Sequence, residues 1–283
     1  MTAPDEPATL LFDRAAWRAH RDRAARSDVR FLHDEVAERL LDRLDLIGRE
    51  FAVALDLGAR DGALARLLAG RCPQIIAAEP SSALLAAAPV PRVVADPEFL
   101  PFGAESVDLA ISSLALHWAA DLPGALIQLR RALKPGGLLL AAMLGGNTLI
   151  ELRTALFDAE LAEEGGVSPR VSPTAELGDA ASLLQRAGYA MPVADVETIT
   201  VTYPDAFALM RDLRGMGETN ALAGRRRTFT RRATLARCAA IYAERFGQAD
   251  GRIPATFDVL FLTGWAPHPS QPKPRPGPRR RIV

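Results

Sequence analysis

The stretch AVALDLGARDG, residues 52–62, decides the fold of this chain. Its apolar first half predicts a buried strand over 51–57, and its second half places Gly58 and Gly62 in a turn. The residues that follow predict a helix over 63–70. A strand, a glycine turn and a helix in this order bring backbone N–H groups and a helix N-terminus to the carboxyl edge of a parallel sheet. Ligands of α/β proteins bind at that edge.

The glycine pattern narrows the choice of ligand. The dinucleotide fingerprint G-x-G-x-x-G, counted from Gly58, needs glycine at the positions of Arg60 and Ala63 and therefore fails. The looser pattern acid-x-Gly-x-Gly-x-Gly of S-adenosylmethionine (SAM) enzymes is met by Asp56, Gly58 and Gly62, but Arg60 replaces its middle glycine. Taken alone, such a turn is as compatible with a structural role as with a cofactor site.

Polar side chains end the three strands that we expect next. The runs are 74–78 before Glu79, 92–95 before Asp96, and 107–112, which ends in Ser112 and is followed by Ser113. Glu79 lies about 20 residues beyond the glycine turn, where an acid can accept both hydroxyls of a ribose. Any one of these acids could instead be a helix N-cap or a solvated carboxylate. Acids at three successive strand ends, Asp56 included, predict a polar row at one sheet edge.

Composition bounds the class of protein. The chain has 283 residues, 49% hydrophobic and 24% charged, which suffices for one α/β domain with an insertion or for two small domains. The formal net charge of zero gives no pull towards nucleic acid. No apolar run approaches the ~20 residues of a membrane span, and the start shows no signal-peptide pattern, so we expect a soluble cytoplasmic protein. Cys72 and Cys238 are expected to be reduced thiols.

The sequence gives little support for a metal-binding site. There are four histidines, and a His-x-acid step joins His33 to Glu35 on a stretch with the pattern of an amphipathic helix. We interpret that step as a solvated pair and see no facial triad for iron, so no metal site is predicted.

The order of elements predicts the domain organisation. Strands and helices alternate through 51–144, which implies right-handed crossovers and a mostly parallel sheet, and this part is the expected SAM-binding core. Two helices over 1–50 precede it. The first, over 12–27, is rich in arginine and is either a solvated helix or a lid.

Beyond the core, strands and helices no longer alternate regularly. Residues 145–250 are expected to form helices and loops over the ligand edge with one late strand, and 251–265 to form the last strand of a seven-stranded sheet. A tail over 266–283, rich in proline and arginine, is expected to be disordered. The fold class is therefore α/β, Rossmann-like, with a helical lid insertion.

Particular blocks carry a resemblance to known proteins. They are FDR (12–14), LDLG (55–58), ADPEFLPF (95–102), DLAISSLALHWAADLPGAL (108–126), LKPGG (133–137), GGNTLIELR (145–153), EGGVSPRVSP (164–173), DLRGMGETNA (212–221) and DGRIPATFDVLFLTGW (250–265). The early blocks resemble class I SAM-dependent methyltransferases in general. Together with the late ones they resemble the mitochondrial complex I assembly factors that hydroxylate an arginine. The same blocks resemble more loosely the malonyl-acyl-carrier-protein methyltransferases of biotin synthesis.

The resemblance implies roles for individual residues. It assigns the amino-acid end of SAM to Asp56 and the glycine turn, the ribose to Glu79, and the adenine amino group to Asp96. Ser112 and Leu114 would form a wall beside the sulfonium. The complete set implied for the cofactor is Asp56, Gly58, Ala59, Arg60, Gly62, Glu79, Pro80, Asp96, Pro97, Ser112 and Leu114.

The acceptor side of the site is implied with less detail. His117 and Trp118 would face the acceptor and act in catalysis, and an aromatic face near a sulfonium gains ~0.5–2 kcal/mol of cation–π attraction. A core pair at the start of a helix is the equal alternative for these two residues. Asn147 and Arg153 are the candidates for substrate binding.

Two departures from the family pattern predict weak SAM binding. Arg60 stands where backbone comes closest to the cofactor and where a positive φ is needed, which adds bulk, charge and about 1 kcal/mol of strain. Pro97 has no backbone N–H to offer to adenine. We therefore expect Arg60→Gly to tighten SAM binding.

Three functions remain open at this point. The first is modification of a protein substrate, an arginine of a complex I subunit, by hydroxylation or methyl transfer. The second is O-methylation of malonyl-acyl-carrier protein, for which Arg153 and the arginines of 225–227 could anchor the acidic partner. The third is a non-catalytic assembly chaperone with a SAM fold. All three predict a protein partner and no nucleic acid.

Overall fold

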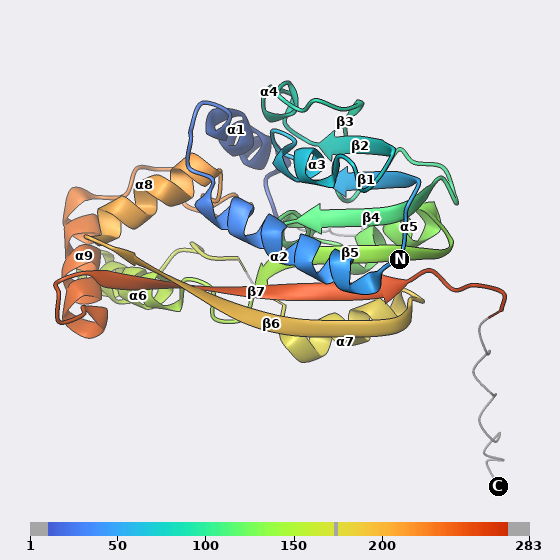
Figure 1. The fold of residues 1–283 in the computed structure, drawn as a ribbon. Helices are drawn as coiled ribbons and strands as arrows, with labels where there is room; N and C mark the ends of the chain where they lie inside the picture. Colours follow the sequence, from blue (N-terminus) through green and yellow to red (C-terminus); the bar gives the residue numbers. More distant parts are fainter. Residues whose placement is uncertain (1–10, 173–174, 271–283) are drawn as a thin grey trace, which may run out of the picture.

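The computed structural model describes residues 11–172 and 175–270 (Figure 1). Its centre is a seven-stranded sheet in the order β3-β2-β1-β4-β5-β7-β6. The strands are β1 (Val53–Leu57), β2 (Gln74–Glu79), β3 (Arg92–Val94), β4 (Val107–Ser113), β5 (Leu133–Gly145), β6 (Ala190–Tyr203) and β7 (Ile253–Trp265). The first five run parallel, whereas β7 is antiparallel to both β5 and β6. The predicted mostly parallel seven-stranded sheet is thus confirmed.

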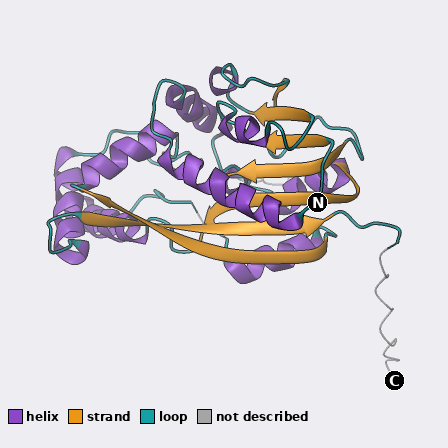
Figure 2. Cartoon of the chain, viewed as in Figure 1, coloured by secondary structure: helices purple, strands orange, loops and turns teal. Residues whose placement is uncertain are grey.

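Helices cover both faces of this sheet (Figure 2). They are α1 (Arg14–Ala24), α2 (Phe31–Ile47), α3 (Ala63–Leu68), α4 (Ser82–Leu85), the 3-10 turn η1 (Leu116–Trp118), α5 (Leu122–Ala132), α6 (Ile150–Glu164), α7 (Leu177–Arg186), α8 (Ala206–Met216) and α9 (Arg232–Phe246). Residues of α2, α3, α6, α8 and α9 share one hydrophobic core, and α5 and α7 pack on the other face. The long strands β6 and β7 run out towards α6 and α9 (Figure 1).

The period of the strands explains the two cores. Successive side chains of a strand point to opposite faces. In β5, Leu138, Leu140 and Ala142 therefore join the α2 side, whereas Leu139 and Ala141 join the α5 side. Because both faces are covered, the strand is apolar throughout rather than alternating.

Most expected elements are present within a few residues of their predicted bounds. The helix before the KPGG stretch, α5, ends at Ala132, and β5 begins at Leu133. KPGG is absorbed in β5 as a shift of register: Val107 pairs with Leu133, but Leu109 pairs with Leu138. The predicted tail lies outside the described residues from position 271 onwards.

The position of α1 decides between the two interpretations of the arginine-rich first helix, a solvated helix and a lid. The alternative of a solvated helix is wrong for α1, because Trp17 and Arg21 are among the largest fully buried side chains of the described chain. α1 packs against α4 and α8, beside the carboxyl ends of β1 and β2 (Figure 1). It therefore covers the edge where the sequence predicts the ligand.

Candidate active site

The turn between β1 and α3 requires glycine at two positions. Gly58 and Gly62 both have φ of 77°, which L side chains rarely adopt. A Cβ on Gly58 would lie 2.3 Å from the Cβ of Ala115, and one on Gly62 would lie 2.9 Å from the Cα of Ala88. Arg60, between them, has φ of 52°, which confirms the expectation that this position is left-handed and strained for a side chain.

The backbone donors of this turn are bound within the protein. The N–H groups of Gly58 and Ala59 donate to the carbonyl of Ala78 at 2.8 and 3.1 Å. That of Arg60 donates to Oε2 of Glu79 at 3.1 Å. The turn is therefore closed on the end of β2 and ties the first two strand tips together.

Glu79, at the tip of β2, forms a buried ion pair with α1. Nε and Nη2 of Arg21 each donate to one carboxylate oxygen of Glu79 at 2.6 Å, and the two side chains are 1% and 0% exposed. The backbone N–H of Ser81 adds a bond of 3.0 Å to Oε1. Burial lowers the pKa of Arg21, but the charge of Glu79 and the hydrogen bonds outweigh it, and the pKa is raised. The predicted ribose carboxylate is thus held by this chain's own guanidinium.

Asp96, which follows β3, is held in a similar way. Arg14 at the start of α1 donates to both oxygens of Asp96, with an Nε–Oδ2 distance of 2.9 Å. The same arginine donates through Nη1 to the carbonyl of Trp118 at 2.6 Å. Pro80 and Pro97, the prolines that follow these two acids, are buried. One helix therefore binds two of the three predicted strand-end carboxylates.

Asp56, the third of them, is buried and only partly compensated, since the backbone N–H of Ala65 alone acts to lower its pKa. Its side chain is nearly inaccessible, and its Oδ2 has no hydrogen-bond partner among the described residues. Burial raises its pKa to about 7, and the negative charge of Glu79 acts in the same direction. Ser112 and Ser113 at the tip of β4 are buried and likewise have hydroxyls without a partner in the described part of the chain. Leu114 follows with φ of 50°.

His33 of α2 joins this set, which corrects an expectation. The predicted solvated pair with Glu35 is wrong, because His33 is buried and Glu35 instead binds Arg39 on the helix surface. Within residues 11–172 and 175–270, neither ring nitrogen of His33 has a partner. Burial, with the charges of Arg60 and Arg21, holds its pKa well below the usual value. The amphipathic pattern predicted that one face of α2 is buried, but it did not show that His33 lies on that face.

The space among these groups is small. Asp56, Gly58, Arg60, Ser113 and His33 are among the residues that line a cavity of about 20 Å³. Sites for small molecules usually measure roughly 300–1,000 Å³. The unpaired oxygens suit a polar ligand, but this arrangement of α1 and Arg60 does not fit the predicted cofactor.

A larger cavity, of about 300 Å³, lies next to the strand tips. Its walls are mainly apolar, and its polar groups include His117, Trp118 and Glu218. Most of the apolar lining comes from α2, β5, α6, α8, β7 and the turn before α6: Leu32, Leu144, Leu149, Leu152, Leu156, Met210, Leu213 and Phe257. Asn147 and Arg153 do not line it. The backbone N–H of Asn147 donates to Asp258 at 2.9 Å, and Nε and Nη2 of Arg153 are buried without partners among the residues described.

Glu218 is the functional candidate that the sequence reasoning missed. Its Oε2 accepts a bond of 3.1 Å from Nε1 of Trp118 and lies 3.1 Å from Nε2 of His117. Its Oε1 is buried and has no partner in the described ranges. Burial opposes ionisation, but His117, Arg21 and Arg60 outweigh it and lower the pKa of Glu218. The signal was present, since Glu218 lies in the block DLRGMGETNA, but nothing local in that block shows its partners.

His117 and Trp118 combine both roles considered for them. Trp118 packs against Phe12 and Trp17, with ring centroids 5.2 and 5.9 Å away, as a core residue would. Both residues also line the larger cavity and orient Glu218. They therefore connect α1 to the acceptor side of the site.

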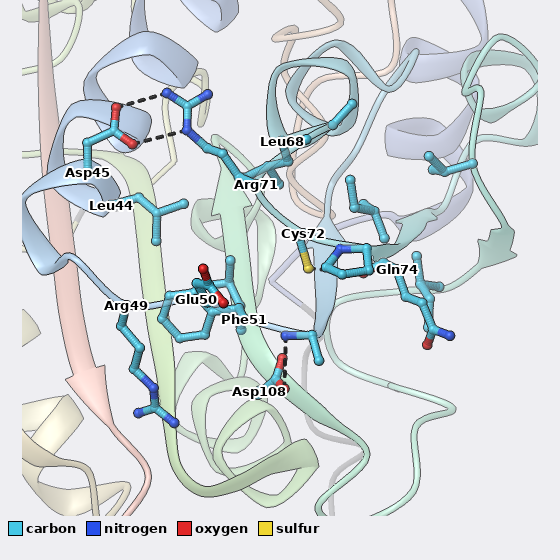
Figure 3. Close-up of a pocket in the computed structure, with 18 of the residues that line it drawn as sticks. Leu44, Asp45, Arg49, Glu50, Phe51, Leu68, Arg71, Cys72, Gln74 and Asp108 are labelled. Atoms are coloured by element: carbon cyan, nitrogen blue, oxygen red, sulfur yellow. Dashed lines mark hydrogen bonds and ion pairs between the residues drawn. The ribbon is translucent and has the colours of Figure 1, made fainter.

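A broader hollow lies at the opposite edge of the sheet (Figure 3). It measures about 1,400 Å³ and is lined by residues around the amino ends of β1, β2 and β4. Several of its charged groups bind each other or backbone: Arg71 pairs with Asp45 at 2.9 Å, and Asp108 accepts from the N–H of Val53 at 2.7 Å. In the part of the chain that is described, no cluster of three or more His, Cys, Asp or Glu could hold a metal ion. None of the side chains that line this hollow has a buried polar atom without a partner among the described residues, in contrast to the carboxyl edge.

Comparison with known proteins places this chain in a family. A methyltransferase-domain family model matches residues 55–141. An arginine-hydroxylase NDUFAF5 of Danio rerio is 42% identical over 274 residues, which cover 93% of this chain and 85% of that protein. A malonyl-[acyl-carrier protein] O-methyltransferase of Xylella fastidiosa is 38% identical, with 91% and 89% covered. The crystal structure of a putative methyltransferase from Bacillus halodurans matches with a TM-score of 0.56 at 15% identity, covering 81% of this chain and 98% of that one.

These findings agree with the sequence and with the topology. The methyltransferase domain supports SAM as the cofactor, as the sequence predicts. No helix among the described residues is long and apolar enough to cross a membrane. The chain belongs to the family of methyltransferase-domain proteins that includes the NDUFAF5 arginine-hydroxylases.

Proposed function

We propose that this chain is a SAM-dependent enzyme that modifies an arginine side chain of a protein, a respiratory complex I subunit during assembly. The relatives named arginine-hydroxylases support hydroxylation, and the methyltransferase domain keeps methyl transfer as the other form of the same proposal. The observation that carries the choice of arginine is Glu218 at the polar end of the larger cavity.

The charge of Glu218 suits a guanidinium. The carboxylate is ionised, buried and oriented by His117 and Trp118, and its second oxygen is available within the described structure. A guanidinium can bind such a carboxylate with short charge-assisted hydrogen bonds. The aliphatic stem of an arginine matches the apolar walls, among them Leu152, Met210 and Leu213. One residue type thus satisfies both halves of the cavity.

A malonyl group suits the same cavity less well. Its free carboxylate would meet the negative charge of Glu218. Arg170 also lines the cavity, but its Nε donates to Glu160 at 2.8 Å and its Nη1 to Thr230 at 3.1 Å. A carboxylate that entered this cavity would therefore be repelled by Glu218, and Arg170, which is already bound, would not be available to pair with it.

A purely structural chaperone leaves the buried polar atoms unexplained. Asp56, Ser112, Ser113 and Glu218 each bury an oxygen without a partner in the described chain. Each such group costs about 1–3 kcal/mol of stability. Uncompensated polar groups gathered in one place are typical of a site that binds or reacts.

Intact masses of the complex I subunits test the proposal. In a strain lacking this protein, we expect one subunit to be lighter by one oxygen for hydroxylation, or by one methylene for methylation. The wild-type gene and Glu163→Gln, a change at an exposed position of α6, are expected to restore the mass. Glu218→Gln is expected not to restore it.

Two outcomes would contradict the proposal. Identical subunit masses with and without the protein would exclude modification of this substrate. Formation of malonyl methyl ester from malonyl-acyl-carrier protein and SAM, with unchanged subunit masses, would favour the carrier protein as acceptor.

A further inference from the structure

We propose that α1 is an internal latch on the cofactor site, with Arg21 and Arg14 bound where the cofactor's ribose and adenine would bind. Cofactor binding then requires α1 to withdraw from the strand tips. This inference rests on the proposed function, because it takes the carboxyl edge of the sheet to be the SAM site. It adds a conformational requirement that the proposed function does not contain.

The hydrogen bonds of Glu79 show that its carboxylate is already saturated. A carboxylate has about four lone-pair sites. Glu79 accepts from Nε and Nη2 of Arg21 and from the backbone N–H groups of Arg60 and Ser81. Ribose hydroxyls can therefore bind Glu79 only after the guanidinium leaves.

Asp96 repeats the arrangement one strand away. Arg14 binds both of its oxygens, and the backbone N–H of Glu98 donates to Oδ1 at 3.0 Å. Arg14 and Arg21 are seven residues apart, two turns of helix, and so lie on one face of α1. A single movement of that helix would release both carboxylates.

The charges of the closed site mimic those of the proposed ligands. Arg21 and Arg60 are buried with Glu79 and Glu218, two cations with two anions. The ligands of the proposed reaction are a sulfonium and a guanidinium, both cationic. If α1 withdraws, Arg21 and Arg14 leave with it and the carboxylates become available to a positive ligand. The latch thus keeps the carboxylates paired while the ligands are absent.

Further contacts hold α1 in place and connect it to the acceptor side. The hydroxyl of Ser81 donates to Asp22, Asp13 before the helix binds Arg225, and Trp17 packs on Trp118. Trp118 in turn donates to Glu218. Residues 25–30, without helix, join α1 to α2 and provide the segment about which it can swing. Withdrawal of α1 would therefore also alter the wall of the acceptor cavity.

The latch has a measurable effect on affinity. A ligand that binds only the open form has an apparent Kd equal to its intrinsic Kd divided by the open fraction. If the open fraction is a tenth or less, a substitution that opens α1 tightens binding about tenfold or more. Arg60→Gly is expected to tighten binding as well, because it removes a strained side chain and a cation from the cleft.

Titration calorimetry of the full chain with SAM tests the latch. The variants are wild type, Arg21→Gln, Arg21→Lys and the control Arg71→Gln, which breaks an equally bidentate pair on the opposite edge of the sheet. We expect Arg21→Gln to bind at least tenfold tighter than wild type and Arg71→Gln to bind like wild type. Arg21→Lys keeps the charge but loses the fork and should lie between them. If Arg21→Gln does not fold, Arg21→Lys carries the comparison alone.

Hydrogen exchange supplies a second readout. Amides of residues 14–24 in the wild type should exchange faster with saturating SAM than without it. Equal affinity of the Arg21 variants and the wild type, or slower exchange in α1, would overturn the latch while the proposed function stands. Tighter binding together with unchanged subunit masses would support the latch and contradict the proposed acceptor. If no protein in the series binds SAM, both proposals fail.

Discussion

The two edges of the sheet carry the same kind of ion pair in opposite surroundings. Arg21 and Glu79 at the carboxyl edge, and Arg71 and Asp45 at the amino edge, are each joined by two parallel N–H···O bonds. The side chains of the first pair are 1% and 0% exposed, and those of the second are 44% and 53% exposed. Water solvates the charges of Arg71 and Asp45 whether or not they pair. The buried charges of Arg21 and Glu79, in contrast, depend on each other for compensation.

The edge with the larger cavity is not the edge with the unpaired buried groups. The amino edge has the broad hollow of about 1,400 Å³, and the carboxyl edge has about 20 Å³ over the glycine turn. Yet the carboxyl edge holds the unpaired buried oxygens, the strained Arg60 and the pKa of Asp56 raised to about 7. The carboxyl edge is therefore distinguished by buried groups that the fold leaves without full compensation, and the amino edge only by its larger empty volume.

The largest expected effect comes from Asp56. Its pKa is about 7 in the folded protein, against an ordinary value of 3.8, so the unfolded chain ionises at lower pH than the folded one. The folded state therefore loses stability as pH rises from about 4 to 7. Asp56→Asn removes this loss and should raise the free energy of unfolding by about 4 kcal/mol at pH 8, but by little at pH 4. Urea unfolding at both pH values measures the difference.

Asp108 provides the contrasting substitution at the amino edge. Its carboxylate accepts hydrogen bonds from the backbone N–H groups of Ala52 and Val53. Asp108→Asn should therefore lower stability at both pH values. If Asp56→Asn also lowers stability at pH 8, ionisation of Asp56 does not destabilise the folded protein and the contrast between the two edges fails.

The two ion pairs give the next effect. Arg21→Gln leaves the buried carboxylate of Glu79 without its guanidinium and should cost about 3 kcal/mol in the free energy of unfolding. Arg71→Gln, in solvent, should leave that free energy unchanged within experimental error. Urea unfolding at pH 7 compares them directly. Equal losses from both substitutions would show that burial does not distinguish the pairs.

His33 gives the smallest expected effect, and its sign is opposite to that of Asp56. Its folded pKa lies well below the unfolded value of 6.5, so acid protonates the unfolded chain first and stability falls with falling pH. The contribution should amount to about 1.4 kcal/mol per pH unit below 6.5. His33→Leu should remove that part of the slope between pH 6.5 and 5. An unchanged slope would mean that the histidine is protonated in the folded protein.

The sequence predicted what is local in this molecule. The glycine turn, the strand-end acids and the seven strands follow from patterns within short stretches, and the structure has them where expected. The left-handed backbone at Arg60 was also predicted, because its neighbours define a turn that needs such a residue.

The parts that escaped prediction depend on long separations in the chain. Arg21 binds Glu79 across 58 residues, and His117 binds Glu218 across 101. An arginine-rich helix looks solvated until its partner is known, and a glutamate in a turn shows no sign of burial. Charge pattern and helix period contain no information on such pairs, so the latch and Glu218 could be found only in three dimensions.

The most direct measurement of the central claim is photo-crosslinking of labelled SAM to the full chain, followed by peptide mapping. Arg21→Gln is included beside the wild type to raise occupancy. We predict label on peptides covering 56–62 and 112–118, at the carboxyl edge, and more of it in Arg21→Gln. Label on peptides covering 44–52 and 70–76, which line the large hollow of the amino edge, would contradict the account.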